Sequence, residues 1–201
     1  MKKNILVYLS LLVLGCSEPN VNLKELSSNA VILAFGDSLT YGTGASDEQA
    51  YPSILARLTS HEVVNEGIPG EISRDGANRL PGLLDEIQPE LLILIHGGND
   101  ILKKIPRTET AKNLGKMIAE AKQRNISVIL LGVPEPKLFA TSSAEIYQTI
   151  AEQYIIAADL STLPEILRDR DLKSDMVHPN AKGYSQMAEN IYNLLKRTGA
   201  L

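Results

Sequence analysis

Short apolar runs alternate with amphipathic helical periods along most of the chain, and this alternation constrains the fold more than any other feature. The first run, Val31–Phe35, ends at Gly36. Similar runs lie at Glu62–Asn65, Leu91–His96 and Ser127–Leu131, with a weaker one at Tyr154–Ala158. A run without polar alternation predicts a strand buried on both faces, as in a parallel sheet, and parallel strands need long, usually helical, crossovers.

The helical periods between these runs each place apolar residues on one face. The faces are Tyr51, Ile54, Leu55 and Leu58; Ala77, Leu80, Leu83, Leu84 and Ile87; and Ala111, Leu114, Met117, Ile118 and Ala121. A last helix at about 182–196 directs Tyr184, Met187, Ala188, Ile191, Leu194 and Leu195 inward. The pattern predicts an α/β protein whose parallel sheet of about five strands is covered by helices on both faces.

Composition excludes several other classes. The 201 residues are 44% hydrophobic and 22% charged, which is too apolar for a disordered chain. A single Cys excludes a disulfide framework and a Cys-rich zinc fold. The net charge is -4 and Lys and Arg are scattered, so we expect no nucleic-acid partner.

The N-terminus has the pattern of an export signal. Lys2 and Lys3 precede an apolar run that ends at Val13-Leu14-Gly15-Cys16 and is too short to span a bilayer. This string resembles the lipobox of bacterial lipoproteins, which implies that Cys16 becomes lipidated. We therefore expect a signal peptide at 1–15, a lipidated Cys16 with a polar tether at 16–29, and one domain at 30–201. The expected location is the bacterial cell envelope, with the lipid anchor in the outer membrane facing the periplasm, because Ser17 rather than Asp follows the Cys. The alternatives are an ordinary secretory signal with an incidental Cys and a buried first helix.

Small and polar residues follow the expected strands, at the edge where open parallel sheets bind ligands. Gly36–Gly42 follows the first strand, Asn65–Gly70 the second and Gly97–Asp100 the third. A further loop, Asp175–Asn180, precedes the last helix. Together these loops contain a hydroxyl, a carboxamide, a carboxylate and an imidazole at this edge of the sheet.

Ser38, His178 and Asp175 have the chemistry of a serine-hydrolase site. A serine hydroxyl is a weak nucleophile until a base removes its proton, and the base works best when a third group orients it. The three-residue step from Asp175 to His178 lets one turn direct the carboxylate at the imidazole. The candidate oxyanion donors are the backbone N–H groups of Ser38 and Gly67 and the side-chain amide of Asn99.

The order of these motifs resembles the GDSL, or SGNH, hydrolase family over nearly the whole chain beyond the N-terminus. The matching blocks are Gly36-Asp37-Ser38-Leu39, Gly67, Gly98-Asn99-Asp100 and the pair Asp175 and His178. The resemblance implies a flavodoxin-like three-layer α/β/α sandwich with nucleophile Ser38, base His178, orienting Asp175 and oxyanion donors Ser38, Gly67 and Asn99. It implies no metal or other cofactor. The string from Asn65 through Asp100, which contains Arg79-Leu80-Pro81 and Gln88-Pro89, is most similar to the bacterial thioesterase I, lysophospholipase L1 and arylesterase group.

We therefore expect a monomeric serine esterase that acts on lysophospholipids, aryl esters or short-to-medium acyl esters, with acyl thioesters as further substrates. The stretch Gly132–Phe139 is expected to form the specificity wall, with Leu138 and Phe139 in contact with the acyl group. Two alternatives remain open: an O-acetylesterase acting on cell-wall carbohydrate, and a lipoprotein that keeps the fold only as a binding module.

Other polar residues near these motifs have simpler expected roles. His96 ends an apolar strand and is expected to be a satisfied histidine of the core or its rim. Asp100 is expected to be structural and His61 to be solvated. Ser73 is a candidate substrate contact without a neighbouring base.

Overall fold

The computed structural model describes residues 21–135 and 143–201, and a five-stranded parallel sheet forms its centre. The spatial order of the strands is β2-β1-β3-β4-β5. Their bounds are β1 (Val31–Gly36), β2 (Glu62–Gly67), β3 (Leu91–Ile95), β4 (Ser127–Leu131) and β5 (Ala157–Asp159). This is the flavodoxin-like order, so the predicted fold class is confirmed.

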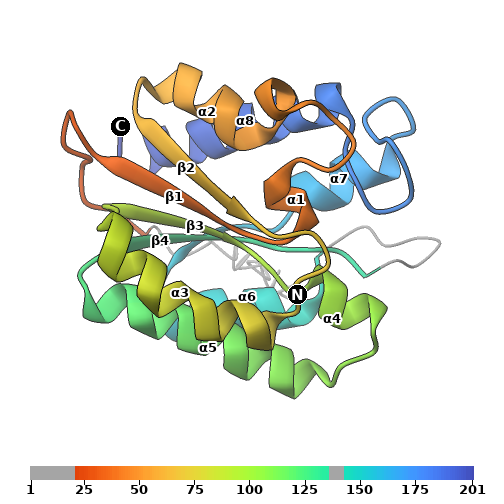
Figure 1. Cartoon of the computed structure of the whole chain (residues 1–201), viewed down its shortest axis with the longest axis horizontal. Helices are drawn as coiled ribbons and strands as arrows, with labels where there is room; N and C mark the ends of the chain where they lie inside the picture. The colour runs from red at the N-terminus through yellow and green to blue at the C-terminus, as the bar shows by residue number, and fades with distance from the viewer. Residues whose placement is uncertain (1–20, 136–142) are drawn as a thin grey trace, which may run out of the picture.

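Helices cover both faces of the sheet and complete the three layers (Figure 1). Helices α2 and α8 lie on one face, and α3, α5 and α6 lie on the other. The helices are α1 (Ser38–Tyr41), α2 (Tyr51–Thr59), α3 (Ser73–Ile87), α4 (Gly98–Leu102), α5 (Arg107–Gln123), α6 (Glu145–Tyr154), α7 (Thr162–Arg168) and α8 (Ala181–Arg197), with a short 3-10 helix η1 (Asp47–Gln49).

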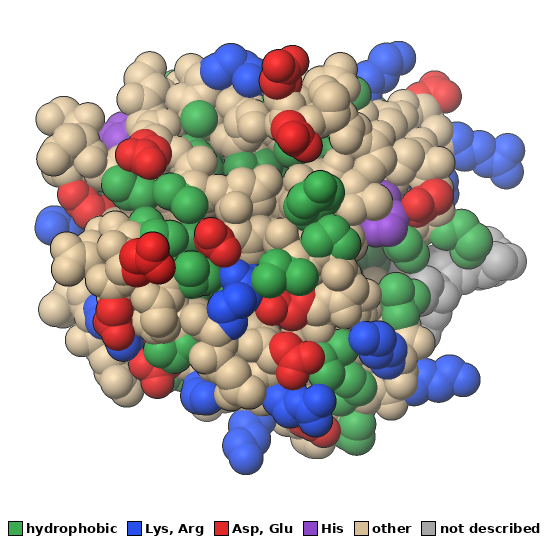
Figure 2. Space-filling model, viewed as in Figure 1, with side chains coloured by type: hydrophobic (Ala, Val, Ile, Leu, Met, Phe, Trp, Pro, Cys, Tyr) green, Lys and Arg blue, Asp and Glu red, His purple; other side chains and the backbone are tan. Residues whose placement is uncertain are grey.

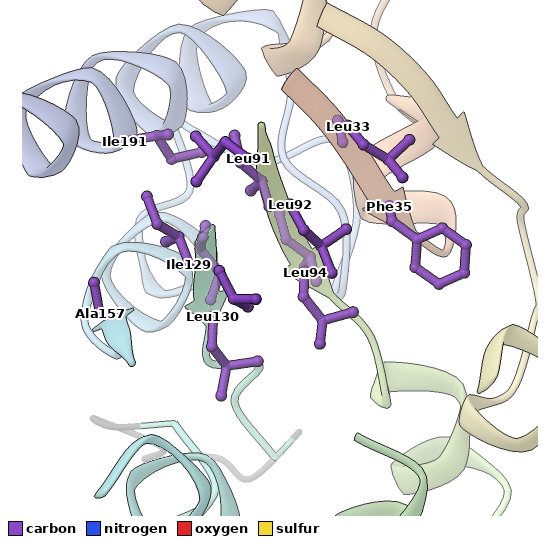
Figure 3. Packing of buried hydrophobic residues seen from close by; sticks show 14 of the residues in the cluster. Leu33, Phe35, Leu91, Leu92, Leu94, Ile129, Leu130, Ala157 and Ile191 are labelled. Carbon is purple, nitrogen blue, oxygen red and sulfur yellow. The ribbon is translucent and has the colours of Figure 1, made fainter. Parts of the chain in front are cut away.

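The core lies where the central strands meet these helices. Every residue of β3 is buried, as are five of the six residues of β1. Figure 3 shows Leu91, Leu92 and Leu94 of β3 packed beside Ile129 and Leu130 of β4, with Ile191 contributed by α8. The apolar face predicted for the last helix is buried throughout.

The strand order also determines where a ligand site can form. Strand β2 pairs with one edge of β1, and β3, which comes next in the chain, pairs with the opposite edge of β1. The loops after β1 and β3 therefore diverge at the carboxyl end of the sheet, and such a switch point opens a crevice.

Three local expectations differ from the structure. The fifth strand starts at Ala157, because α6 continues through Tyr154 and ends with Ile155 in a left-handed conformation, at φ 50°. Strand β2 is half-exposed, because it lies at the edge of the sheet. Leu58 is 38% exposed, since the buried face of α2 is centred on Tyr51 and Leu55.

The segment expected as a tether is, in its described part, attached to the domain. The N–H groups of Leu23 and Leu26 donate to the carbonyls of Thr198 and Ala200 at 2.8 and 2.9 Å. Val21, Leu23 and Leu26 also pack against the core. The described part of the expected tether is therefore held against the residues near the C-terminus by backbone hydrogen bonds and apolar contacts.

The expected signal peptide and the lipidation site Cys16 lie outside the described residues. Within 21–135 and 143–201, no helix has the length and apolar character that crossing a membrane requires.

Candidate active site

Ser38 stands at the carboxyl end of β1, as the first residue of α1. The preceding Gly36 packs directly on the neighbouring strand: a Cβ there would lie 2.0 Å from the Ile95 carbonyl oxygen, so only glycine fits. Asp37 then caps α1, because its Oδ1 accepts the Leu39 N–H at 3.1 Å. The Gly-Asp-Ser sequence thus ends the strand, starts the helix and places the serine at the switch point.

The structure brings the three residues of the expected triad together. His178 Nε2 lies 2.9 Å from Ser38 Oγ, and His178 Nδ1 lies 2.7 Å from Asp175 Oδ2. The two ring nitrogens therefore face the hydroxyl and the carboxylate at hydrogen-bond distance, although the serine and the histidine are 140 positions apart in the sequence.

The loop that carries His178 is held by its own hydrogen bonds. Asp175 Oδ1 accepts the backbone N–H groups of Val177 and His178 at 2.8 and 2.9 Å. The Ser174 N–H donates to the His178 carbonyl at 2.9 Å. Asn180 caps α8 through its side-chain oxygen and donates from its amide to the Asp171 carbonyl at 2.9 Å. The imidazole is therefore presented from a closed turn.

Partial burial alone would raise the pKa of Asp175, but hydrogen bonds from the His178 ring and from the two backbone N–H groups lower it on balance. Asp175 is thus favoured as a carboxylate. A negative charge beside Nδ1 stabilises an imidazolium, the state of a histidine that has accepted a serine proton.

The two expected oxyanion donors outside Ser38 have different surroundings. Asn99, on α4, lines the same pocket as Ser38 and His178. Its Nδ2 donates one hydrogen bond to the Glu71 carbonyl at 3.0 Å, and the amide carries a second N–H.

Gly67 does not fit the role expected of it. It is the last residue of β2, its N–H donates to Asn65 Oδ1 at 3.0 Å, and it is absent from the described residues that line the pocket. A Cβ on Gly67 would lie 2.1 Å from the Tyr41 nitrogen, so this glycine serves close packing against α1. Gly70, three residues further, lines the pocket and has a φ of 82°. If the strand is taken to continue to Gly67, Gly70 is the glycine of the loop that follows it, and the sequence then favours Gly70.

A second carboxylate, Asp37, is buried beside the nucleophile. Burial raises its pKa, although the nearby His96, the Leu39 N–H and His178 act in the opposite direction. Its Oδ2 is the one buried side-chain oxygen or nitrogen of the described residues without a hydrogen-bond partner. Burial therefore favours the neutral acid at this position.

Asp100 is structural, as expected. Its Oδ2 accepts the Ser73 N–H at 2.8 Å, and its Oδ1 accepts from the hydroxyls of Ser73 and, at 3.2 Å, Thr110. Ser73 is fully buried in this network and is wrong as a substrate contact. His61 is also partnered rather than simply solvated, because its ring nitrogens contact the Thr59 and Ser27 carbonyls at 2.9 and 3.0 Å.

The pocket beside Ser38 has a volume of about 650 Å³. Apolar side chains supply most of its described wall: Leu39, Pro69, Leu102, Val133, Pro134, Pro164, Leu167, Met176 and Val177. Arg168 and Lys173 also line it. Of the expected specificity wall, Val133, Pro134 and Glu135 line the pocket, whereas Leu138 and Phe139 lie outside the described residues.

Glu71, in the loop between β2 and α3, belongs to a charged cluster that the sequence did not reveal. Its carboxylate accepts from Arg79 Nε at 2.9 Å and Nη2 at 2.8 Å, and His96 Nε2 lies 3.1 Å from Oε2. Burial alone would raise the pKa of Glu71, but the hydrogen bonds and positive charge lower it to about 2.

This lowered pKa predicts that the fold loses stability in acid. The ordinary value is 4.5, so on acidification the unfolded chain binds this proton first. The contribution of Glu71 to the free energy of unfolding is then complete above about pH 4.5 and lost as the pH falls toward 2. Solvent screening of the partly exposed Arg79 reduces it to about 1–3 kcal/mol. Urea unfolding at pH 7 and pH 3 should show a smaller difference for Glu71→Gln than for the wild type; equal differences would contradict the assignment.

No group of three or more His, Cys, Asp or Glu side chains in the described part of the chain is placed to hold a metal ion. On the face shown in Figure 2, Lys and Arg side chains are interspersed with Asp and Glu and do not gather into a stripe.

The site places a serine hydroxyl, an imidazole and a carboxylate in one chain of hydrogen bonds, at the switch point of a parallel α/β sheet. This arrangement defines a hydrolase of the serine type. The class is thus indicated by fold and geometry together.

Comparison with known proteins gives the family. Residues 34–186 match the model of the GDSL-like Lipase/Acylhydrolase family. The chain belongs to this family, whose members hydrolyse ester bonds.

Similar proteins support the same assignment. Esterase TesA of Pseudomonas aeruginosa is 27% identical over 93% of this chain and 98% of its own. The Escherichia coli protein named thioesterase 1/protease 1/lysophospholipase L1 is 30% identical over 74% of this chain and 75% of its own. Among solved structures, AlinE4, an SGNH-hydrolase family esterase, is 32% identical with a TM-score of 0.64, over 86% of this chain and 98% of that one.

Proposed function

We propose that the chain is a serine esterase that forms an acyl-enzyme on Ser38. The main support is the chain of contacts through His178, whose Nδ1 lies 2.7 Å from Asp175 Oδ2 and whose Nε2 lies 2.9 Å from Ser38 Oγ. A domain kept only for binding would have no need of this alignment, so the geometry favours catalysis over the binding-module alternative.

In the proposed reaction His178 Nε2 takes the Ser38 proton as Oγ attacks the ester carbonyl carbon. The carbonyl oxygen becomes an oxyanion, and collapse of this intermediate breaks the ester C–O bond. The leaving alkoxide takes the proton from His178 and departs as an alcohol. Water then gives its proton to His178, attacks the acyl-enzyme and releases the carboxylic acid, with the proton returned to Ser38.

We propose three donors for the oxyanion: the Ser38 N–H, the second N–H of the Asn99 amide and the Gly70 N–H, which replaces Gly67. Gly70 and Asn99 both line the pocket beside Ser38, which supports their assignment.

Asn99→Ala tests the side-chain donor. Removal of one oxyanion donor should lower kcat about 10²- to 10³-fold and leave KM nearly unchanged, because the lost bond forms only as charge develops. The check is steady-state hydrolysis of a p-nitrophenyl ester by both proteins. A rise in KM at constant kcat would assign Asn99 to ground-state binding instead.

The pocket supports acyl esters as substrates. Its largely apolar wall suits a short-to-medium acyl chain, and its volume of about 650 Å³ exceeds what an acetyl group fills. Arg168 and Lys173 offer positive charge to a polar head group such as that of a lysophospholipid. The relatives named Esterase TesA and thioesterase 1/protease 1/lysophospholipase L1 point to the same substrate range.

Hydrolysis of p-nitrophenyl acetate, butyrate, octanoate and palmitate tests this range. We expect Ser38-dependent hydrolysis with a preference beyond acetate, and release of fatty acid from a lysophospholipid. Activity confined to acetate, with release of acetate from acetylated glycan, would favour the O-acetylesterase alternative.

We also propose that Cys16 anchors the protein in the bacterial cell envelope, at the outer membrane facing the periplasm. The support is the Val13–Cys16 string after an apolar run with two leading lysines. Cys16→Ser should end labelling by radioactive palmitate and move the protein from the membrane fraction to the soluble one. A Cys16→Ser protein that stayed in the membrane fraction would contradict the proposal.

A further inference from the structure

The buried cluster of Glu71, Arg79 and His96 lies directly behind the proposed oxyanion donors. The side chains of Glu71 and His96 are 7% and 0% exposed, and that of Arg79 is 22% exposed. The Arg79 guanidinium also contacts Glu66 Oε2 at 3.0 Å and stacks over the Phe35 ring, 4.3 Å from its centre. The cluster therefore holds Glu71 from two sides.

The hydrogen bonds of His96 determine its tautomer. Nδ1 lies 3.0 Å from the Gly97 nitrogen and accepts that N–H, so the ring proton is on Nε2 and is donated to Glu71 Oε2. The Tyr147 hydroxyl donates to the His96 carbonyl at 2.8 Å. His96 thus connects the Glu71 carboxylate to the left-handed turn at Gly97 from which α4 starts.

Glu71 is in turn connected to Asn99. Its backbone carbonyl accepts one N–H of the Asn99 amide at 3.0 Å, which sets the rotation of the amide and leaves the other N–H for the pocket. Asn99 is therefore fixed twice: its backbone through the His96–Gly97 contact, and its side chain through the Glu71 carbonyl.

Helix α3 is shaped around this cluster. A Cβ at Gly76 would lie 2.4 Å from His96 Nε2 and 3.3 Å from Glu71 Oε2. A buried ionic group is often no more stabilising than apolar residues of the same volume. The cluster needs a residue without a side chain at Gly76 and charged groups that are largely removed from water. Its contribution to fold stability alone therefore explains its presence poorly.

We propose that Glu71, held by His96 and Arg79, is a positioning residue that orients the Asn99 amide toward the oxyanion. The inference rests on the proposed function, since it assigns a supporting role within that active site. Its effect is on geometry, because the Glu71 carboxylate contacts the cluster and only the backbone carbonyl of the residue reaches Asn99.

Glu71→Gln is the first test, because it keeps the shape and the backbone carbonyl but removes the charge that holds the side chain. We expect kcat to fall about 10- to 100-fold with KM nearly unchanged, since a small displacement of a catalytic donor has that cost. Arg79→Lys keeps the positive charge but not the double contact and should give a smaller loss of the same kind. It serves as the test if Glu71→Gln fails to fold.

A double-mutant cycle with Asn99→Ala separates positioning from general destabilisation. If Glu71 acts through Asn99, Glu71→Gln should cost less than about 3-fold in kcat once Asn99 is Ala, because the group it positions is gone. Arg124→Met is the matched control: it removes a distant arginine that contacts Asp85 and Glu120, both at 2.8 Å, and should leave kcat unchanged.

The outcomes distinguish the two proposals. Ser38-dependent activity with an unchanged kcat in Glu71→Gln would overturn the positioning role alone, as would full additivity with Asn99→Ala. Absence of Ser38-dependent hydrolysis in the wild type would overturn the proposed function and the positioning role with it.

Discussion

Replacing Ser38 by Ala should lower kcat for any hydrolysed ester roughly 10⁴- to 10⁶-fold, since the residual rate then comes only from binding and oxyanion stabilisation. Ser38 is the hydroxyl that His178 Nε2 contacts at 2.9 Å. KM should change little, because Oγ is a small part of the pocket. Steady-state kinetics on a p-nitrophenyl ester, with enzyme purified free of contaminating esterases, measures the effect.

The matched control is the exposed Ser28, on the segment before β1. Ser28→Ala should keep wild-type kcat, and both variants should unfold at the wild-type denaturant concentration within error. A folded Ser38→Ala protein with more than a tenth of wild-type activity would contradict the nucleophile assignment.

His178→Ala should cause a loss of the same order, because the serine then has no base and the leaving group has no acid. The two variants should also be strongly non-additive: Ser38→Ala combined with His178→Ala should be no slower than either alone, since nucleophile and base act as one unit. His61→Ala is the control, because the ring nitrogens of His61 contact the Thr59 and Ser27 carbonyls and His61 does not line the described pocket.

Both the rate and its pH dependence report on His178. Hydrolysis by His178→Ala should be slow and should rise with hydroxide concentration, as expected when solvent replaces the base. Multiplicative losses in the double variant would mean that the two side chains act independently and would contradict the proposed mechanism.

Much of the fold could be predicted because the pattern of apolar residues within each segment indicates the strand or helix that the segment forms. The runs that became β1, β3 and β4 are apolar at successive positions, and α8 shows the full helical period of buried residues. The fifth strand was placed too early, because Tyr154 and Ile155 are as apolar as strand residues although they end a helix. The attachment of Val21–Asn29 depends on carbonyls near the C-terminus, to which no local pattern points.

The triad was predictable, whereas its surroundings were only partly so. Ser38, Asp175 and His178 stand in short motifs with a chemical reason for their spacing, and the structure brings them into contact. Gly67 was expected as a donor because the expected strand ended at Asn65, two residues short of the actual end of β2. The interpretation of His96 as a satisfied core histidine is confirmed, but its partner Glu71 lies 25 residues earlier in another loop.

Covalent labelling of Ser38 tests the central claim most directly. An activated p-nitrophenyl phosphonate should react once with the serine that His178 activates, release one equivalent of p-nitrophenol and leave a stable adduct. Mass spectrometry of the digested wild-type protein should locate this adduct on Ser38, with no adduct in Ser38→Ala and very slow labelling in His178→Ala. An adduct on another residue, or inactivation that persists in Ser38→Ala, would contradict the account.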